Sequence, residues 1–249
     1  MDTQQPTQFN VLLIGDNCTD VYQYGTVDRI SPEAPVPIFK YSRQESRAGM
    51  AGNVAKNLQA LGCEVTYLCG ETSTKTRLID ARSKQQLIRI DDDVISTPII
   101  IDTAVPKIYD AIVISDYNKG TVSYELIEEL IKTDIPVFVD TKKTDLARLQ
   151  GAWVKINELE YSKITSECSG IIITQGAKGA RVIHHDINCS APNVEVVDVT
   201  GAGDTFLSAF VYKYLYTHDL YQSVCFAVEA SAVTVQHLGV YAPTLKEIK

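Results

Sequence analysis

The feature of this sequence that most constrains its fold is a series of short apolar runs, each followed directly by polar residues. From residue 111 onward such runs are followed in turn by Asp116, Asp140, Asn157 and Thr174. An amphipathic helix, predicted over 122–133, separates the first two runs. This pattern predicts a parallel sheet covered on both faces, and ligands bind at the carboxyl ends of such strands. We therefore predict an α/β fold of three layers, with a mainly parallel sheet flanked by helices.

The N-terminal part of the chain repeats this pattern once. Residues 9–15 read as a buried strand, and Asp16 and Asp20 follow it. Carboxylates at the end of a strand can accept hydrogen bonds from a polyol, so we count Asp16, Asp20 and Asp116 as candidates for binding a sugar. The alternative is an ordinary turn rich in Asp and Asn.

Two stretches differ in character from the rest of the chain and predict a small β lid inserted in a single domain of residues 1–249. Residues 21–46 contain three prolines between positions 32 and 37, which a central strand or a helix interior does not tolerate. Residues 73–92 read as further strands. Lys75 and Arg77 would lie on one face of a strand, where two cations suit a phosphate on the substrate. The alternative is that both belong to a solvated lid surface.

A glycine-containing turn near the C-terminus carries the strongest chemical signal. Gly201-Ala202-Gly203 precedes a helical run and leaves several backbone N–H groups unblocked. These donors and the positive end of the helix would attract a phosphate. Asp204 would repel that phosphate unless it accepts a proton from an attacking hydroxyl, which is the role of a general base. The alternative is that Asp204 only stabilises the helix dipole, by about 0.5 kcal/mol.

Composition excludes several classes of function. The 249 residues carry a net charge of −8 and a pI near 5.0, which argues against a nucleic-acid partner. The apolar run 11–14 is too short for a signal peptide or a membrane span, so we expect a cytoplasmic protein with no membrane partner. The six cysteines form no C-x-x-C pair and no zinc-ligand pattern, which favours buried free thiols.

Longer motifs carry a resemblance to a known family. Residues 198–205 resemble the second signature of the ribokinase-like (PfkB) carbohydrate kinases, and residues 49–57 resemble the first. Within that family, residues 29–37, 85–91 and 115–120 resemble the kinase portion of the bifunctional heptose 7-phosphate kinases/ADP-heptose synthases. The resemblance implies ATP-dependent phosphorylation of the anomeric hydroxyl of D-glycero-D-manno-heptose 7-phosphate, a step of ADP-heptose and lipopolysaccharide biosynthesis.

The resemblance also implies roles for individual residues. Asp204 would be the general base, and the backbone amides of the turn would form the anion hole at Gly201, Ala202 and Gly203. The sugar would be held by Asp16, Asp20, Gly49 and Asn53. Asn157 and Glu160 match the N-x-x-E pattern associated with the phosphates and Mg²⁺, with Glu160 acting on the ion indirectly. The nucleotide would be lined by Thr174, Gly176, Gly179 and Thr200. From charge and spacing we also hypothesise that Lys75 and Arg77 clamp the 7-phosphate. Whether the protein requires a monovalent ion is left open.

The sequence departs from the family pattern at several places. Met50 stands where the family has a second glycine, and Val228 stands where it has a small or polar residue. Stretches that would supply helices are missing after Gly70, Asp93 and Cys168, and so is the nucleotidyltransferase domain. A bare sheet face would become an interface, so we expect a homodimer through the β lid and a separate nucleotidyltransferase. The alternatives are a kinase for another sugar or sugar phosphate, and a protein that binds sugar or nucleotide without turnover.

Overall fold

The computed structural model describes residues 8–101 and 108–248, and within them ten strands form one sheet. The strand order is β10-β9-β8-β7-β6-β5-β1-β3-β4, with β2 paired to β1. The central strands run parallel to one another: β3 (Glu64–Asp80), β1 (Asn10–Ile30), β5 (Ala111–Asp116), β6 (Val137–Thr141), β7 (Trp153–Asn157) and β8 (Ile171–Thr174). The antiparallel strands lie at the edges: β9 (Ala180–Val182), β10 (Ile187–Cys189), β2 (Pro37–Met50) and β4 (Gln86–Asp92).

Alternate residues of the central strands face two separate hydrophobic cores. Leu13 and Val113 belong to one core, whereas Leu12 and Ile112 belong to the other. Successive side chains of a strand point to opposite faces, so continuous apolar runs are buried on both sides. The predicted α/β fold of three layers with a mainly parallel sheet is confirmed.

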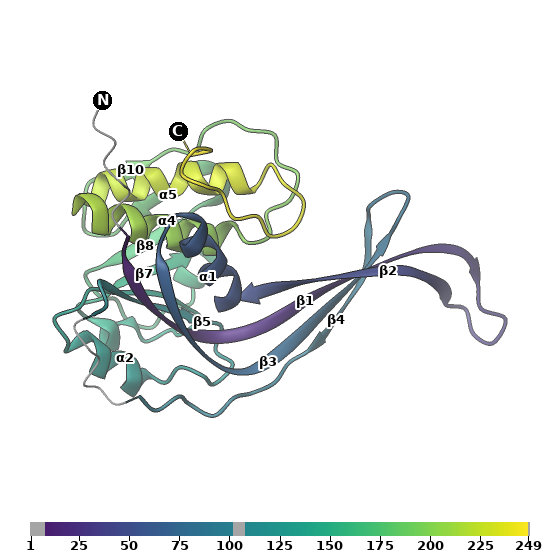
Figure 1. Cartoon of the computed structure of the whole chain (residues 1–249), viewed down its shortest axis with the longest axis horizontal. Coiled ribbons are helices and arrows are strands. Elements are labelled where there is room, and N and C mark those ends of the chain that lie inside the picture. Colours follow the sequence, from purple (N-terminus) through teal and green to yellow (C-terminus); the bar gives the residue numbers. More distant parts are fainter. Residues whose placement is uncertain (1–7, 102–107, 249) are drawn as a thin grey trace.

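Helices cover the two faces unequally. The first core packs against α1 (Ala51–Ala60), α4 (Ala202–Thr217) and α5 (Leu220–Thr234), which lie together on one side of the sheet in Figure 1. The opposite face carries α2 (Tyr124–Ile131), the 3-10 helix η1 (Leu146–Leu149) and the single turn α3 (Glu158–Tyr161). A further 3-10 turn, η2 (Gly176–Lys178), follows β8. The polar residues predicted at the strand ends therefore meet at one edge of the sheet, beside the N-terminus of α4.

The first strand is longer than predicted. We expected it to end at Gly15 and to be followed by a loop, but β1 continues without interruption to Ile30. Its neighbour on one side changes at this point: β5 pairs with residues 11–15, and β2 takes over from Asn17. Gly15 allows the close approach of the strands, because a Cβ there would lie 2.3 Å from the Ser115 carbonyl oxygen.

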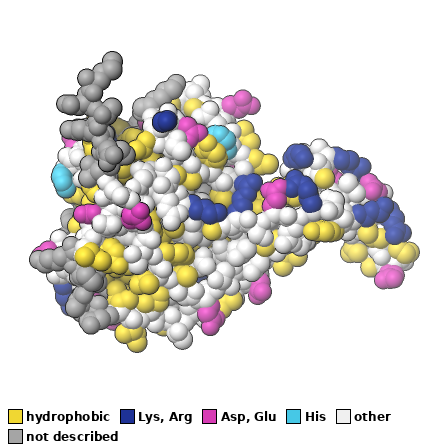
Figure 2. Space-filling view, viewed as in Figure 1, with side chains coloured by type: hydrophobic (Ala, Val, Ile, Leu, Met, Phe, Trp, Pro, Cys, Tyr) yellow, Lys and Arg dark blue, Asp and Glu magenta, His cyan; other side chains and the backbone are white. Residues whose placement is uncertain are grey.

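The outer parts of β1 and β3, together with β2 and β4, project from the core as a curved four-stranded β extension, defined here as residues 17–50 and 72–92 (Figure 1). These residues include the stretches for which we predicted a lid. Pro32 and Pro35 lie in the bend between β1 and β2, and Pro37 is the first residue of β2, opposite Ile30. In Figure 2, Lys and Arg side chains gather along the extension and where it joins the core.

The sheet face that we expected to be bare is partly covered by an extended segment, residues 93–101. Ile99 and Ile101 pack against the second core, and the Ile99 amide donates to the Thr121 carbonyl oxygen. No helix in the described part of the chain is long and apolar enough to cross a membrane.

The cysteines differ from our prediction of free buried thiols. Cys189 of β10 and Cys225 of α5 form a disulfide, and Cys69 is exposed. Only Cys18, Cys63 and Cys168 are buried and free. The disulfide partners are 36 residues apart and become neighbours only when α5 packs over the edge of the sheet.

Candidate active site

A larger and a smaller cavity meet at the N-terminus of α4. Successive residues of the glycine turn face different sides: Ala202 and Gly203 line the larger cavity, whereas Gly201 and Asp204 line the smaller one. The volumes are about 560 Å³ and 110 Å³. A phosphate bound by this turn would therefore lie between two ligands, one in each cavity.

The turn has the backbone conformation that its sequence requires. Gly201 caps α4 with φ of 82°, in the left-handed region that glycine adopts without strain. Asp198 fixes the preceding residues, because its Oδ1 accepts from the backbone N–H and the hydroxyl of Thr200. Its Oδ2 accepts from the Gly239 amide. The turn is thus held by side chains before any ligand arrives.

Asp204 is almost completely buried in the first turn of α4. The Asn53 amide nitrogen donates to its Oδ2 at 2.8 Å, and the Tyr117 hydroxyl donates to its Oδ1 at 2.9 Å. Burial raises the pKa of Asp204 from 3.8 to about 6, although both hydrogen bonds and the Lys155 charge oppose this shift. A carboxylate with a pKa near 6 is ionised at neutral pH and basic enough to accept a proton from a hydroxyl.

The smaller cavity lies at the base of the β extension. It is lined by Cys18, Asp20, Gly49, Met50, Lys75, Arg77, Tyr117, Thr200, Gly201, Asp204 and Val240. Arg77 forms an ion pair with Asp20, and both side chains are mostly buried, so neither is free to bind a ligand alone. A Cβ at Gly49 would lie 2.2 Å from Asp20 Oδ2, so this position has no room for a side chain.

Lys75 is the second cation at the smaller cavity. Its Nζ lies 5.8 Å from the centre of the Tyr117 ring, and no ion pair of Lys75 occurs among the described residues. Lys75 and Arg77 share a face of β3, as the alternation of a strand requires. Because the Arg77 side chain is mostly buried, the alternative of a solvated lid surface does not apply to Arg77.

Two predicted sugar-binding carboxylates point elsewhere, and the predicted Asn53 likewise lines neither cavity, since its amide donates to Asp204. Asp16 accepts hydrogen bonds from the backbone amides of Tyr117, Lys119 and Thr121, and so anchors the loop after β5. Asp116 accepts from the Thr141 hydroxyl and pairs with Lys143. Neither residue lines the cavities described above. Their carboxylates are occupied by the protein itself, so we leave both out of the sugar site.

The larger cavity is mostly apolar, as a pocket for an aromatic base would be. It is lined by Thr174, Gly176, Ala177, Gly179, Ala191, Pro192, Asn193, Val194, Val196, Val199, Ala202, Gly203, Phe206, Val228, Ser231, Ala232 and Val235. Thr174, Gly176 and Gly179, which the resemblance implies to line the nucleotide, all line this cavity. Val228 lines it as well. Thr200 differs, because it faces the smaller cavity.

The N-x-x-E pattern forms a capping box at the start of α3. The Asn157 side chain accepts from the Glu160 amide at 2.9 Å, and Glu160 Oε2 accepts from the Asn157 amide at 2.8 Å. Glu160 also pairs with Lys142. Neither residue lines the larger cavity. Within the residues that the structure describes, no group of three or more His, Cys, Asp or Glu side chains could hold a metal ion.

Sequence reasoning missed several residues of the site. Tyr117 is partly buried and donates to Asp204, but it lies 87 positions away in the sequence. Met50 was not missed, because it departs from the family pattern; it lines the smaller cavity with φ of 50°, a conformation in which glycine is favoured. Lys155 forms a buried ion pair with Asp140 beside Gly203. The only advance signal was their position at strand ends or next to a motif.

Comparison with known proteins points to one family. A model of the pfkB family of carbohydrate kinases matches residues 152–247. The chain is 32% identical to the bifunctional protein HldE of a Nitratiruptor species, covering 96% of this chain and 64% of that protein. It is 33% identical to the HldE protein of Sodalis glossinidius, with 92% and 60% covered. The chain thus spans less than two thirds of the length of these relatives.

Solved structures agree with this at the level of the fold. The ribokinase of Arabidopsis thaliana, complexed with ribose and ATP, superposes with a TM-score of 0.72 at 15% identity, covering 97% of this chain and 98% of that one. Phosphofructokinase-2 of Escherichia coli, in complex with potassium, gives 0.72 at 16% identity, with 96% and 97% covered. At these identities the likeness concerns the fold alone.

Proposed function

The chain belongs to the pfkB family of carbohydrate kinases, and from this premise we propose that it transfers the γ-phosphoryl group of ATP to a sugar hydroxyl. One observation supports the proposal above all: the glycine turn stands between a larger apolar cavity and a smaller polar one, and Asp204 faces the smaller. The nucleotide would occupy the larger cavity and the sugar the smaller. The proposal treats residues 1–249 as one kinase domain, with the β extension as its lid.

In the proposed step the sugar oxygen attacks the γ-phosphorus and forms a new O–P bond. The bond between that phosphorus and ADP breaks, and its electron pair goes to the ADP oxygen. The hydroxyl proton passes to Asp204, which Asn53 and Tyr117 hold in place. The amides at Gly201–Gly203 and the positive end of α4 stabilise the negative charge of the phosphoryl group.

Mg²⁺ bound with ATP would neutralise part of the phosphate charge. The described residues offer it no acidic cluster, which fits an ion held mainly by phosphates and water. Glu160, whose mostly buried side chain pairs with Lys142 and accepts from the Asn157 amide, is the carboxylate that we assign to this water shell. Asn157 contributes by capping α3 and holding Glu160 in position.

As the acceptor we propose the anomeric hydroxyl of D-glycero-D-manno-heptose 7-phosphate. Support comes from the identity of about a third to the HldE proteins and from the two cations at the smaller cavity. Lys75 would bind the 7-phosphate, while Arg77 would hold Asp20 against the sugar. The product would be a sugar bisphosphate, the kind of substrate that a nucleotidyltransferase consumes.

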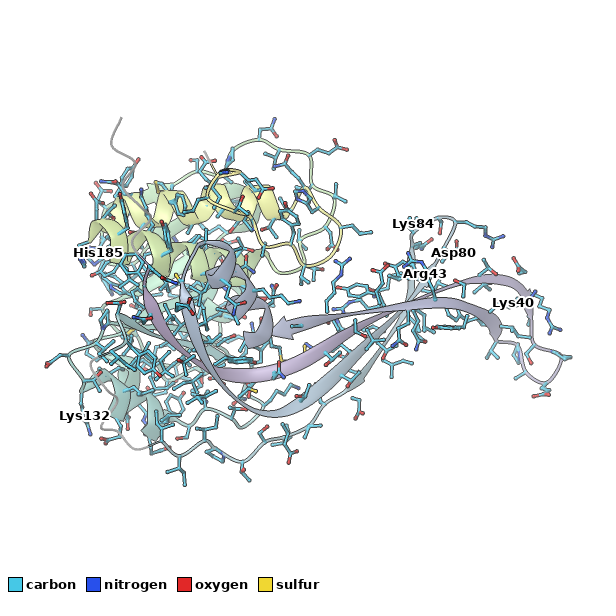
Figure 3. All side chains as sticks on the ribbon, viewed as in Figure 1. Lys40, Arg43, Asp80, Lys84, Lys132 and His185 are labelled. Atoms are coloured by element: carbon cyan, nitrogen blue, oxygen red, sulfur yellow. A yellow bond between two sulfur atoms is a disulfide. The ribbon has the colours of Figure 1, made fainter. Side chains whose placement is uncertain are left out.

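The first experiment follows product formation by mass spectrometry with Mg²⁺-ATP, in either KCl or NaCl, and a panel of sugars with and without a terminal phosphate. We expect phosphorylation of heptose 7-phosphate. Lys75→Met should raise KM for the phosphorylated sugar, because the phosphate loses a charge partner. Lys40→Met is the matched control, since Lys40 lies far out on the extension (Figure 3).

Other outcomes identify the alternatives. If only sugars without the terminal phosphate are phosphorylated, the proposal of a sugar kinase stands. The proposal that Lys75 binds the 7-phosphate is then wrong. Binding of ATP and sugar without any turnover would favour a protein that has kept the fold and lost the reaction. The intact turn and the buried Asp204 argue against this second alternative.

A further inference from the structure

Lys155 lies on β7 and has a buried ammonium group. Its side chain is 7% exposed, and Nζ donates to Asp140 Oδ2 at 2.7 Å. Asp140 is buried to the same degree at the end of β6. An ammonium has three donors, and in the described part of the chain only Asp140 accepts from this one.

The ammonium is directed at the glycine turn. A Cβ added to Gly203 would lie 2.8 Å from Lys155 Nζ and 3.8 Å from Cε. The absence of a side chain at Gly203 therefore leaves the space that the ammonium occupies. Gly203 in turn lines the larger cavity, so Lys155 lies directly beside the proposed phosphate site.

The hydrogen bonding of this ammonium is incomplete without a further acceptor. A lysine beside a helix N-terminus is repelled by the positive end of the helix. Asp140 balances the charge of Lys155, and Asp204 in the first turn of α4 faces the positive end of the helix. Two of the three N–H donors of Lys155, however, have no acceptor among the described residues. Asp204, the other acidic group nearby, already accepts from Asn53 and Tyr117.

We propose that Lys155 is a catalytic residue of this kinase, whose ammonium, held by Asp140, binds the phosphoryl group while it passes across the Gly201–Gly203 turn. The inference rests on the proposed function and adds a residue to it. As the bond to ADP breaks and the bond to the sugar oxygen forms, negative charge spreads over the oxygens of the transferred group. Lys155 stabilises that charge and transfers no proton, because Asp204 takes the one that the hydroxyl loses.

The test measures binding of a mimic of the transferred group, so it does not depend on knowing the acceptor. Affinity for ADP and Mg²⁺ is measured by calorimetry with and without aluminium fluoride. For the wild type we expect aluminium fluoride to tighten ADP binding at least about 10-fold. Lys155→Met should lose this gain and keep its affinity for ADP alone. Its kcat should fall by about 10²–10³-fold with KM for the sugar unchanged.

Two further variants guard against a purely structural effect. Lys155→Met leaves Asp140 buried and unpaired, so the double variant Asp140→Asn/Lys155→Met is measured as well and should show the same loss. Lys132→Met removes an exposed lysine that follows α2, far from the turn, and should behave as the wild type (Figure 3). Lys155→Arg should retain part of the gain, because the charge remains.

The outcomes separate this inference from the function on which it rests. If the wild type and both Lys155→Met variants gain equally from aluminium fluoride, Lys155 does not bind the phosphoryl group and the inference is overturned, while the kinase proposal stands. If the wild type itself gains nothing, both are overturned together.

Discussion

At the scale of single residues, the burial of Asp204, our proposed general base, lowers stability at neutral pH. Its folded pKa, about 6, lies above its ordinary value of 3.8 because the carboxyl is buried. The stability that this group contributes is present below pH 3.8 and is lost as the pH rises through 6. At neutral pH the ionised carboxylate therefore weakens the fold.

We predict that Asp204→Asn raises the free energy of unfolding at pH 7, by at most about 3 kcal/mol, while kcat falls by about 10²–10⁴-fold.

Because the base must be ionised, kcat/KM of the wild type should decline below about pH 6. Tyr117→Phe removes a donor to the carboxylate and should move this decline to higher pH. A rate that does not change between about pH 5 and 8 would contradict the role of Asp204.

Met50 carries a second residue-scale prediction. Its side chain is buried, but its φ of 50° and ψ of −133° belong to a region that favours glycine. Met50→Gly and Met50→Ala both lose the buried side chain, and only glycine relieves the backbone. We therefore expect Met50→Gly to be more stable than Met50→Ala by about 1 kcal/mol in denaturant unfolding.

The matched control for Met50 is Ala55→Gly, in the interior of the helix that follows. At position 55 the protein with glycine should be less stable than the protein with alanine by about 1 kcal/mol, as is usual inside a helix. The same order at Met50 would show that its backbone stores no strain. Met50→Gly also enlarges the smaller cavity, so KM for the sugar should change with it.

At the scale of elements, the loop after β5 depends on one carboxylate of β1. Asp16 is buried and accepts three backbone hydrogen bonds from residues 117–121, and this loop presents Tyr117 to Asp204. We predict that Asp16→Ala lowers the free energy of unfolding by about 3–5 kcal/mol and speeds hydrogen exchange in this loop, because buried N–H groups lose their acceptor. Asp28→Ala, on the exposed part of the extension, should do neither.

A loss of activity larger than the loss of folded protein is also expected for Asp16→Ala, since Tyr117 would no longer be held against Asp204. Wild-type exchange rates at Tyr117, Lys119 and Thr121 would contradict this account. Faster exchange and the larger loss of activity would both support a structural role for Asp16, exerted through the loop that it holds.

At the scale of the whole molecule, the β extension carries apolar side chains that nothing in the described chain covers. Leu87, Ile88 and Ile90 of β4 are 43%, 52% and 53% exposed. Apolar residues on an open edge strand favour association, so we propose a homodimer through the extension. Sedimentation at micromolar concentration should show a dimer, and Ile88→Lys/Ile90→Lys should shift it to a monomer.

Tyr221→Lys, which alters an exposed side chain of α5 on the core, should leave the dimer intact. A wild type that sediments only as a monomer would contradict the proposal. Because the smaller cavity lies at the base of the extension, dissociation should also raise KM for the sugar.

The layers of the fold and the position of the turn were determined by the sequence. Apolar runs with polar ends specify buried parallel strands whatever their order, and Gly201 specifies a backbone conformation within a few residues. Lys75 and Arg77 share a face because a strand alternates. Each of these properties depends on neighbours in the chain, so a local pattern is sufficient to predict it.

The partners of each side chain were decided only by the tertiary structure. Tyr117 reaches Asp204, Asp16 and Asp116 turn to the protein instead of the cavity, and Lys155 lies against Gly203. Cys189 and Cys225 meet for the same reason. These contacts join segments that are distant in the sequence, and they depend on strand order and helix packing, which no local pattern specifies.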